Sequence, residues 1–373
     1  MKKIIVSVIN DLSTDQRVHR HCDTLVKKGY EVLLVGRQWR DSLPIEGRNY
    51  STKRMRLLFN KGALFYAEYN IRLFFFLLFT KAHGYFSNDL DTLLPNFLCS
   101  IIKRKPLIYD SHEYFTEVPE LQNRKFPRGV WIAIEKLIFP KLKNVITVNT
   151  SIANIYQSNY AVSMAVVRNV PLSRNIPKVS REELGIDPNK KVMILQGAGI
   201  NKDRGVEELV EAMWYIHSND ILLIIVGTGD VMEKIDELVW RHALEKKVML
   251  TGKLPMEDVV KYTSIADLGI TLDKDTNLNY RYSLPNKLFD YIQCGLPVFA
   301  TNLVEVKRII DQYELGEVAS HLEASYLAKK LEELMHDDEK LARYRANSVK
   351  ASLELNWENE KVVLEQVIDN AYH

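Results

Sequence analysis

Cysteine is scarce in this sequence. The chain of 373 residues contains three cysteines, Cys22, Cys99 and Cys294, an odd number without the paired spacing of a metal site. We therefore expect free thiols in a reducing cytoplasm, which excludes a disulfide framework and a structural zinc site.

Long apolar segments are also missing. The apolar start of the chain is broken at Asn10 and Asp11, so it is too short for the apolar core of a secretory signal, and we expect no secretion. A second apolar run, Ile71–Phe79, contains Arg72 and is too short to span a bilayer. We expect a helix over residues 61–82 that is either a core helix or one lying at a membrane surface.

The net charge is only +2, but the charges are unevenly distributed. Residues 1–168 contain 25 Lys and Arg against 14 Asp and Glu, whereas the remainder contains 25 against 34. A basic N-terminal half favours an anionic partner, and we expect a membrane face there and not nucleic acid, because no nucleic-acid motif is present. A solvated basic face without a partner is the alternative.

Apolar strands alternate with helical stretches along the chain, which predicts parallel sheets. One such series ends near Arg168, and a second begins at Lys191. Between them, the polar and proline-containing stretch 169–177 is predicted to be an interdomain linker. We therefore predict an α/β fold with two Rossmann-like, doubly wound domains, whose ligands bind beyond the carboxyl ends of the strands in a cleft between the halves.

Residues 282–297 contain the most informative pattern. Pro285 fits the first position of a short helix, whose unpaired amides and dipole favour an anion beside Asn286 and Lys287. Asp290 follows one turn later on the same side of the helix. This spacing suits a nucleotide, with a diphosphate on the amides and the ribose hydroxyls on the carboxylate. An ordinary capped helix is the alternative.

The same stretch resembles a known family. Ser283-Leu-Pro-Asn-Lys-Leu-Phe-Asp290-Tyr, followed by Gly295-Leu-Pro-Val, is similar to the donor-site motif of the family-4 retaining glycosyltransferases (glycosyl transferases group 1), which have the GT-B fold. The resemblance implies that Asp290 is the second carboxylate of a Glu-x7-Glu pair and holds the ribose. The first position of that pair falls on Tyr282, which departs from the family pattern. The implied donor-binding residues of this motif are Tyr282, Ser283, Leu284, Pro285, Asn286, Lys287 and Asp290.

Two glycine turns follow predicted strands. The first, Gly197-Ala-Gly199-Ile-Asn-Lys202-Asp-Arg204, lets the backbone approach a phosphate and supplies two cations at a helix start. It resembles the phosphate loop of the family, in which Lys202 and Arg204 would meet the leaving group. The second, at Gly227, resembles the family's loop near the base. A plain helix start and a simple tight turn are the respective alternatives.

Polar residues follow two strands of the N-terminal half. His112 comes directly after the predicted strand 106–110, and it matches the family's histidine beside the reacting carbon of the donor sugar. Asp15 lies in the first strand-to-helix loop and either caps the first helix or has a function. Arg17 is predicted to reach the diphosphate or an anionic acceptor.

Two Asp-x-Asp sequences, starting at Asp89 and at Asp273, spell the metal signature of the other major glycosyltransferase fold. We expect Asp91 to cap a helix beginning at Thr92 and Asp273 to lie in a loop. The expected protein therefore has no obligatory metal, and no cofactor besides a nucleotide-diphosphate sugar as co-substrate.

These features predict three parts: an acceptor-side domain (1–170), a donor-binding domain (171–352) and a C-terminal helix packing back on the first domain (353–373). The resemblance implies a metal-independent, retaining hexosyltransferase that moves a sugar to a glycan or lipid-linked acceptor. We expect it in the cytoplasm, at the inner face of the membrane. A nucleotide-sugar epimerase of the same fold and a non-catalytic partner subunit are the alternatives.

Overall fold

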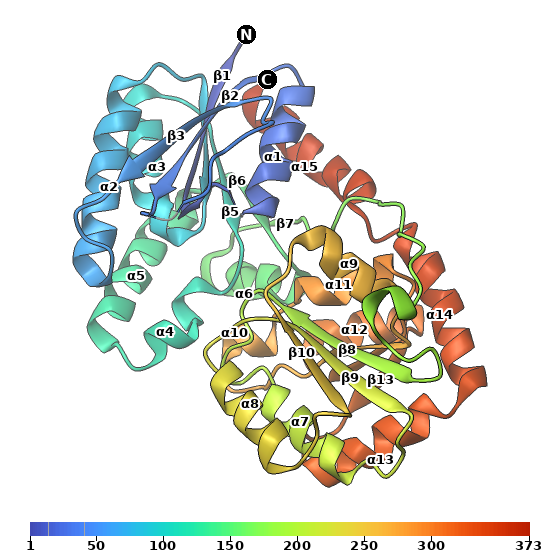
Figure 1. The fold of residues 1–373 in the computed structure, drawn as a ribbon. Helices are drawn as coiled ribbons and strands as arrows, with labels where there is room; N and C mark the ends of the chain where they lie inside the picture. The colour runs from blue at the N-terminus through green and yellow to red at the C-terminus, as the bar shows by residue number, and fades with distance from the viewer. Residues whose placement is uncertain (14, 41) are drawn as a thin grey trace. The chain divides into compact units, whose positions relative to one another are not determined.

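The computed structural model describes residues 1–13, 15–40 and 42–373. The chain forms two compact units: residues 1–169 together with 360–373, and residues 170–359 (Figure 1). Each unit is built around one parallel sheet with helices beside it. The α/β fold with two doubly wound sheets is therefore confirmed.

The sheet of the first unit has seven strands in the order β3-β2-β1-β4-β5-β6-β7. Buried β-branched and aromatic residues dominate the central strands, as expected for a sheet covered on both faces. The strands are β1 (Lys3–Asp11), β2 (Glu31–Gln38), β3 (Ser51–Arg56), β4 (Gly84–Asn88), β5 (Leu107–Ser111), β6 (Asn144–Thr147) and β7 (Ala165–Val166).

Helices of the first unit connect these strands. Asp15 caps the first of them, since its Oδ1 accepts a hydrogen bond from the backbone N–H of Val18 at 3.0 Å. The helices are α1 (Gln16–Lys27), α2 (Gly62–Phe79), α3 (Leu90–Lys103), α4 (Pro119–Gln122), α5 (Lys125–Ile138) and α6 (Thr150–Tyr160), and the last helix of the chain is α15 (Trp357–Tyr372).

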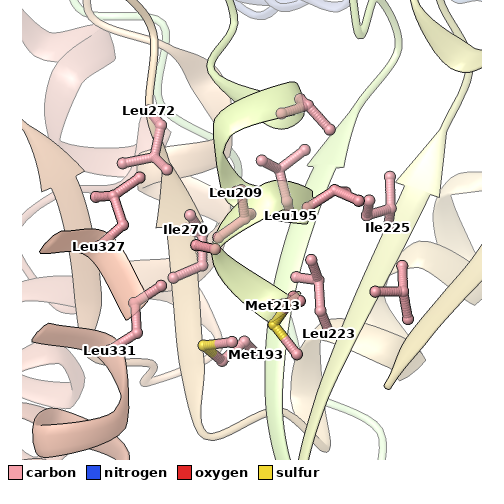
Figure 2. Packing of buried hydrophobic residues seen from close by; sticks show 14 of the residues in the cluster. Met193, Leu195, Leu209, Met213, Leu223, Ile225, Ile270, Leu272, Leu327 and Leu331 are labelled. Atoms are coloured by element: carbon pink, nitrogen blue, oxygen red, sulfur yellow. The ribbon is translucent and has the colours of Figure 1, made fainter. Parts of the chain in front are cut away.

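The sheet of the second unit has six strands in the order β10-β9-β8-β11-β12-β13. Figure 2 shows its core, where apolar side chains of β8, β9 and β11 meet those of α7 and α13. The strands are β8 (Lys191–Gly197), β9 (Ile221–Gly227), β10 (Val248–Gly252), β11 (Leu268–Thr271), β12 (Val298–Thr301) and β13 (Gly316–Ala319). The helices are α7 (Val206–Tyr215), α8 (Met232–Arg241), α9 (Met256–Ser264), α10 (Leu278–Arg281), α11 (Asn286–Gln293), α12 (Val304–Tyr313), α13 (Ala324–Met335) and α14 (Asp338–Ser352).

Strand order fixes where a ligand site belongs in each unit. The chain reverses direction across the sheet between β1 and β4 in the first unit, and between β8 and β11 in the second. Ligands of doubly wound sheets bind at such a switch point, beyond the carboxyl ends of the strands. The loops after β4 and β8 and the residues after β11 therefore hold the candidate positions.

Two local predictions were wrong. Asp91 does not cap α3, because that helix already begins at Leu90 and Asp91 lies buried in its first turn. Pro285 is the residue before α11 and not its first residue, since its backbone is extended, with φ −69° and ψ 139°. The other end of α11 is as expected: Gly295 follows it with φ +68°, a conformation that favours glycine.

Candidate functional site

The glycine turn after β8 is held over the end of the neighbouring strand. Gly205, which ends the turn, has φ +71°, and a Cβ there would lie 2.2 Å from the carbonyl oxygen of Leu272. The backbone N–H of Ile200 donates to the carbonyl of Thr228 at 2.8 Å, and that of Lys202 donates to Asp230 Oδ1 at 2.9 Å. The turns after β8 and β9 are thus fastened together at the switch point.

The predicted glycines differ in what surrounds them. A Cβ on Gly227 would lie 1.9 Å from the carbonyl oxygen of Gly197, so Gly227 is required for packing between the two turns. A Cβ on Gly197 or Gly199 would come no closer than 3.4 Å to its surroundings. The protein's own packing therefore gives no reason for glycine at those two positions.

One carboxylate and two cations gather beside this turn. Arg204 donates from Nη1 to Asp273 Oδ2 at 3.0 Å, and the ammonium of Lys287 lies 3.7 Å from Asp273 Oδ1. Asp273 is 0% exposed, while its partners are partly open. The guanidinium of Arg204 also lies over the ring of Tyr280, with 4.6 Å from its central carbon to the ring centroid.

The charge of this cluster is not balanced within it. Among the residues that the structure describes, none donates a hydrogen bond to Oδ1 of Asp273. Burial lowers the pKa of Lys287, Asp273 raises it and Arg204 lowers it, with a net lowering. Two cations around one carboxylate leave an excess positive charge that suits a bound anion.

Asp290 lies on the same helix as Lys287. Its Oδ1 accepts a hydrogen bond from Nη2 of Arg174 at 3.0 Å, and its Oδ2 accepts one from the side-chain amide of Gln196 at 3.3 Å. Gln196 is itself held by the hydroxyl of Thr263, which donates to Oε1 at 2.6 Å. Asp290 is therefore oriented by groups from the linker stretch and from β8.

The rest of the predicted donor motif surrounds the start of α11. Tyr282 directly follows α10 as its C-terminal cap. Ser283, Leu284 and Pro285 form the half-buried link to α11. Within the described ranges, the buried Oγ of Ser283 has no hydrogen-bond partner. Asn286 is exposed at the first position of the helix. Lys202 is also exposed, on the glycine turn.

In the first unit, His112 lies between two carboxylates. Its Nδ1 is 3.0 Å from Asp89 Oδ2, and its Nε2 is 2.9 Å from Asp110 Oδ2. Burial alone would lower the pKa of His112, but the two carboxylates raise it well above its usual range. The two carboxylates therefore favour the protonated, positively charged imidazole.

Arg17 has a partner within the protein. Its Nε and Nη2 bind both oxygens of Asp110 at 2.8 and 2.7 Å, and its Nη1 donates to the carbonyl of Val167 at 2.8 Å. The Arg17 side chain is 3% exposed. The guanidinium of Arg17 holds Asp110, whose pKa stays well below its usual range, against burial, because of Arg17 and His112. That Arg17 also reaches a diphosphate or an acceptor stays a prediction.

Sequence reasoning missed several members of these clusters. Asp273 was assigned to a loop, although its place two residues after a buried strand is the position where site residues gather. Asp89 and Asp110 follow the same rule at β4 and β5. Arg174 gave no signal, because it lies in a stretch with no regular structure. Over the described ranges, no group of three or more His, Cys, Asp or Glu side chains could hold a metal ion.

Comparison with known proteins gives these clusters a context. Residues 178–351 match the family model described as Glycosyl transferases group 1. Among curated proteins, the chitobiosyldiphosphodolichol beta-mannosyltransferase of Candida albicans is 24% identical over 209 residues, which are 54% of this chain and 45% of that protein. The chain therefore spans less than half the length of this relative.

Solved structures resemble the whole chain. A sucrose-phosphate synthase from Thermosynechococcus elongatus has a TM-score of 0.81 at 16% identity, over 99% of both chains. Anabaena HepE in complex with UDP and glucose has a TM-score of 0.74 at 17% identity, again over 99% of both chains. At these identities the likeness concerns the fold, which is that of the GT-B proteins.

Proposed function

We propose that this chain, whose residues 178–351 match the family model of the glycosyl transferases group 1, transfers a sugar from a nucleotide-diphosphate sugar to an acceptor. The observation that carries the proposal is the cluster of Arg204, Lys287 and Asp273 at the switch point of the second unit, with Asp290 one helical turn beyond Lys287. A diphosphate fits the cations, and a ribose fits the carboxylate.

The cations would act on the leaving group. As the bond between sugar and diphosphate breaks, negative charge grows on the diphosphate oxygens. Arg204, Lys287 and the first amides of α11 are fixed before the reaction, so they stabilise that charge without reorganising. Lys202 adds a further cation on the exposed turn. We propose that this arrangement takes the place of a metal ion.

Asp290 would hold the ribose hydroxyls. The carboxylate is already oriented by Gln196 and Arg174, so little side-chain entropy is lost when a hydroxyl binds. A ribose at this position would share or replace the Arg174 contact. By resemblance to the family, His112 would contact the donor sugar, and its positive charge suits an electron-rich sugar oxygen.

We further propose a retaining mechanism and a lipid-linked or glycan acceptor at the cytoplasmic face of a membrane. The family resemblance supports retention. The acceptor is supported by the dolichol-linked substrate in the name of the Candida albicans relative and by the basic first half of this chain. The roles of individual residues that the family resemblance implies stay predictions.

A thermal-shift panel of UDP, GDP, ADP and their common sugars, each with and without EDTA, tests the donor site. A ligand that binds only the native state raises the melting temperature. We expect one nucleotide diphosphate to stabilise the protein equally with and without EDTA. We expect Asp290→Ala to weaken its binding by at least about tenfold, because charge-assisted hydrogen bonds are lost. Asp311→Ala, an aspartate of α12 in the same unit, is the matched control.

Different outcomes would replace the proposal. If no nucleotide diphosphate stabilises the protein, a non-catalytic subunit is the better explanation. Conversion of a nucleotide sugar to its epimer without any acceptor would favour the epimerase. Stabilisation that EDTA abolishes would overturn the metal-independent site.

A further inference from the structure

Helix α2 is apolar on two opposite sides. Its inner stripe, Phe65, Tyr69, Leu73 and Leu77, is buried in the core of the first unit. A second stripe, which we call the α2 face, consists of Leu64, Ile71, Phe75 and Phe79. These four side chains are between 52% and 80% exposed. At 100° per residue the two stripes point in opposite directions, so the α2 face points away from the core.

More apolar side chains are exposed on the segments next to α2. Leu58 and Phe59, in the loop that leads into α2, are exposed. Ile101 and Ile102 are exposed on α3, which packs beside α2 in the same unit (Figure 1). Singly exposed apolar residues are common, but a gathering on neighbouring elements marks an interaction surface.

The charged residues in and next to α2 are mostly basic. Residues 51–81 contain six Lys and Arg and one acidic residue, Glu68. Glu68 is already engaged, because Arg72 lies 2.6 Å from its carboxylate and the backbone N–H groups of Leu58 and Phe59 donate to it. Lys61 precedes α2, Lys81 follows it, and both are exposed.

We propose that the α2 face docks on an anionic phospholipid surface, with α2 lying along the headgroup region. Exposed aromatic and aliphatic side chains bury into the boundary between headgroups and acyl chains, while the surrounding lysines and arginines bind the anionic headgroups. The occupant is the lipid surface itself. This site lies in the first unit and does not depend on the nucleotide site proposed above.

By length and composition alone α2 is also long and apolar enough to cross a membrane, the only such helix among the described residues. Its inner stripe argues against crossing. The hydroxyl of Tyr69 donates to the carbonyl of Val8 at 2.6 Å, and Leu73 and Leu77 are fully buried in the core. Insertion across a bilayer would remove these side chains from the sheet, whereas docking along the surface leaves them in place.

Charge also decides between a lipid surface and a second copy of the chain. A symmetric dimer would place the same basic surface on both sides of its interface, and like charges facing each other are unfavourable. Anionic headgroups instead complement the excess of positive charge in residues 51–81, where six Lys and Arg face one Glu in composition.

Flotation with vesicles tests the proposal directly. The full chain is mixed with vesicles of neutral phosphatidylcholine, or of phosphatidylcholine containing phosphatidylglycerol, at low and at high salt. We expect binding to the anionic vesicles, weaker binding to the neutral ones, and release at high salt. The double variant Phe75→Ser/Phe79→Ser should bind at least about tenfold more weakly, and Lys61→Glu/Lys81→Glu should lose the dependence on anionic lipid.

The controls lie in the second unit. Trp240→Ser removes an aromatic side chain that is 78% exposed on α8, and it should bind vesicles like the natural chain. An unchanged circular dichroism spectrum and a cooperative thermal transition in the α2-face variants would show that they are folded. The proposal is overturned if the natural chain does not float with anionic vesicles or if the Phe75/Phe79 variant floats equally well. It is also overturned if that variant instead converts a dimer to a monomer, or if alkaline carbonate fails to extract the natural chain.

Discussion

Asp89 and His112 form an ion pair on a strained backbone. Asp89 Oδ2 lies 3.0 Å from His112 Nδ1, and Asp89 Oδ1 accepts the backbone N–H of His112 at 2.9 Å. The φ angle of Asp89 is +59°, which favours glycine and costs another residue about 1–3 kcal/mol. Strain that persists beside a charged histidine at a strand end is typical of a functional position.

Replacing Asp89 by Asn should lower the pKa of His112, because one of its two carboxylates becomes neutral. Titration of the His112 ring protons by NMR measures this change. Stability from the charged pair is fully present below the ordinary histidine pKa and is lost as the pH rises through the raised value, so in the variant this loss should be smaller and begin at a lower pH. Asp23→Asn, which alters the partly exposed His19–Asp23 pair instead, should leave the His112 titration unchanged.

The affinity for a nucleotide diphosphate should fall as the pH rises, and the fall should begin below the pH at which an ordinary lysine loses its proton. The pKa of the partly buried Lys287 is lowered overall, so its ammonium loses its proton earlier than that of a surface lysine as the pH rises. Calorimetric titrations between pH 7.5 and 10 would show the decline, and any ionisation of the nucleotide itself affects the natural chain and its variants equally. Lys287→Arg keeps its charge throughout this range and should remove the decline. If both proteins weaken in parallel, Lys287 does not meet the ligand.

Replacement by alanine should affect stability at one glycine of the turn after β8 and not at another. Gly205→Ala places a Cβ 2.2 Å from the carbonyl oxygen of Leu272 at φ +71°, so thermal denaturation should show a loss of stability of about 1–3 kcal/mol. Gly199→Ala meets nothing closer than 3.4 Å and should keep its melting temperature. If a phosphate approaches this backbone, Gly199→Ala should nevertheless bind the nucleotide diphosphate more weakly. Unchanged binding would place the ligand elsewhere.

Buried Glu135 should give the first unit a distinct pH dependence. Burial raises the pKa of this carboxyl to about 7, although the hydroxyls of Tyr160 and Tyr156 oppose the rise. Between about pH 4.5 and 7 the carboxyl of Glu135 is therefore protonated in the folded state but ionised in the unfolded state. Stability falls as the pH rises through this window.

Glu135→Gln should remove this decline. The variant should match the natural protein near pH 5 and exceed its stability by about 1–3 kcal/mol at pH 8. Melting temperatures at both pH values provide the test, and the surface variant Lys125→Gln on the same helix is the control. A gain of equal size at pH 5 would show that the effect is not the titration of Glu135.

Local patterns were sufficient to predict the fold. The alternation of apolar strands and helical stretches indicated two parallel sheets, and the glycine turns after β8 and β9 were found because glycine at a strand end is a short-range signal. The helix boundary at Asp91 was missed, because Asp89 adopts a conformation that sequence rules reserve for glycine.

The charged clusters could not be predicted in the same way. Arg17 and Asp110 are separated by 93 positions, and Arg204 and Asp273 by 69. Such pairs form only when the sheet places distant strand ends side by side, so the partner of each cation follows from strand order and not from local spacing. The assigned donor and catalytic residues remain predictions until a ligand is bound.

The closing residues of the chain belong to the unit that begins it. Tyr372 donates from its hydroxyl to the carbonyl of Tyr85 at 2.7 Å, and Lys2 donates to the carbonyl of Tyr372 at 2.8 Å. Residues 170–359, the whole second unit, are synthesised between these partners. On the ribosome the second unit is thus complete in sequence before residues 360–373 emerge. The first unit is translated first but is the last to acquire all its contacts. It therefore spends the longer time in an incomplete state, with exposed surface that chaperones and proteases recognise.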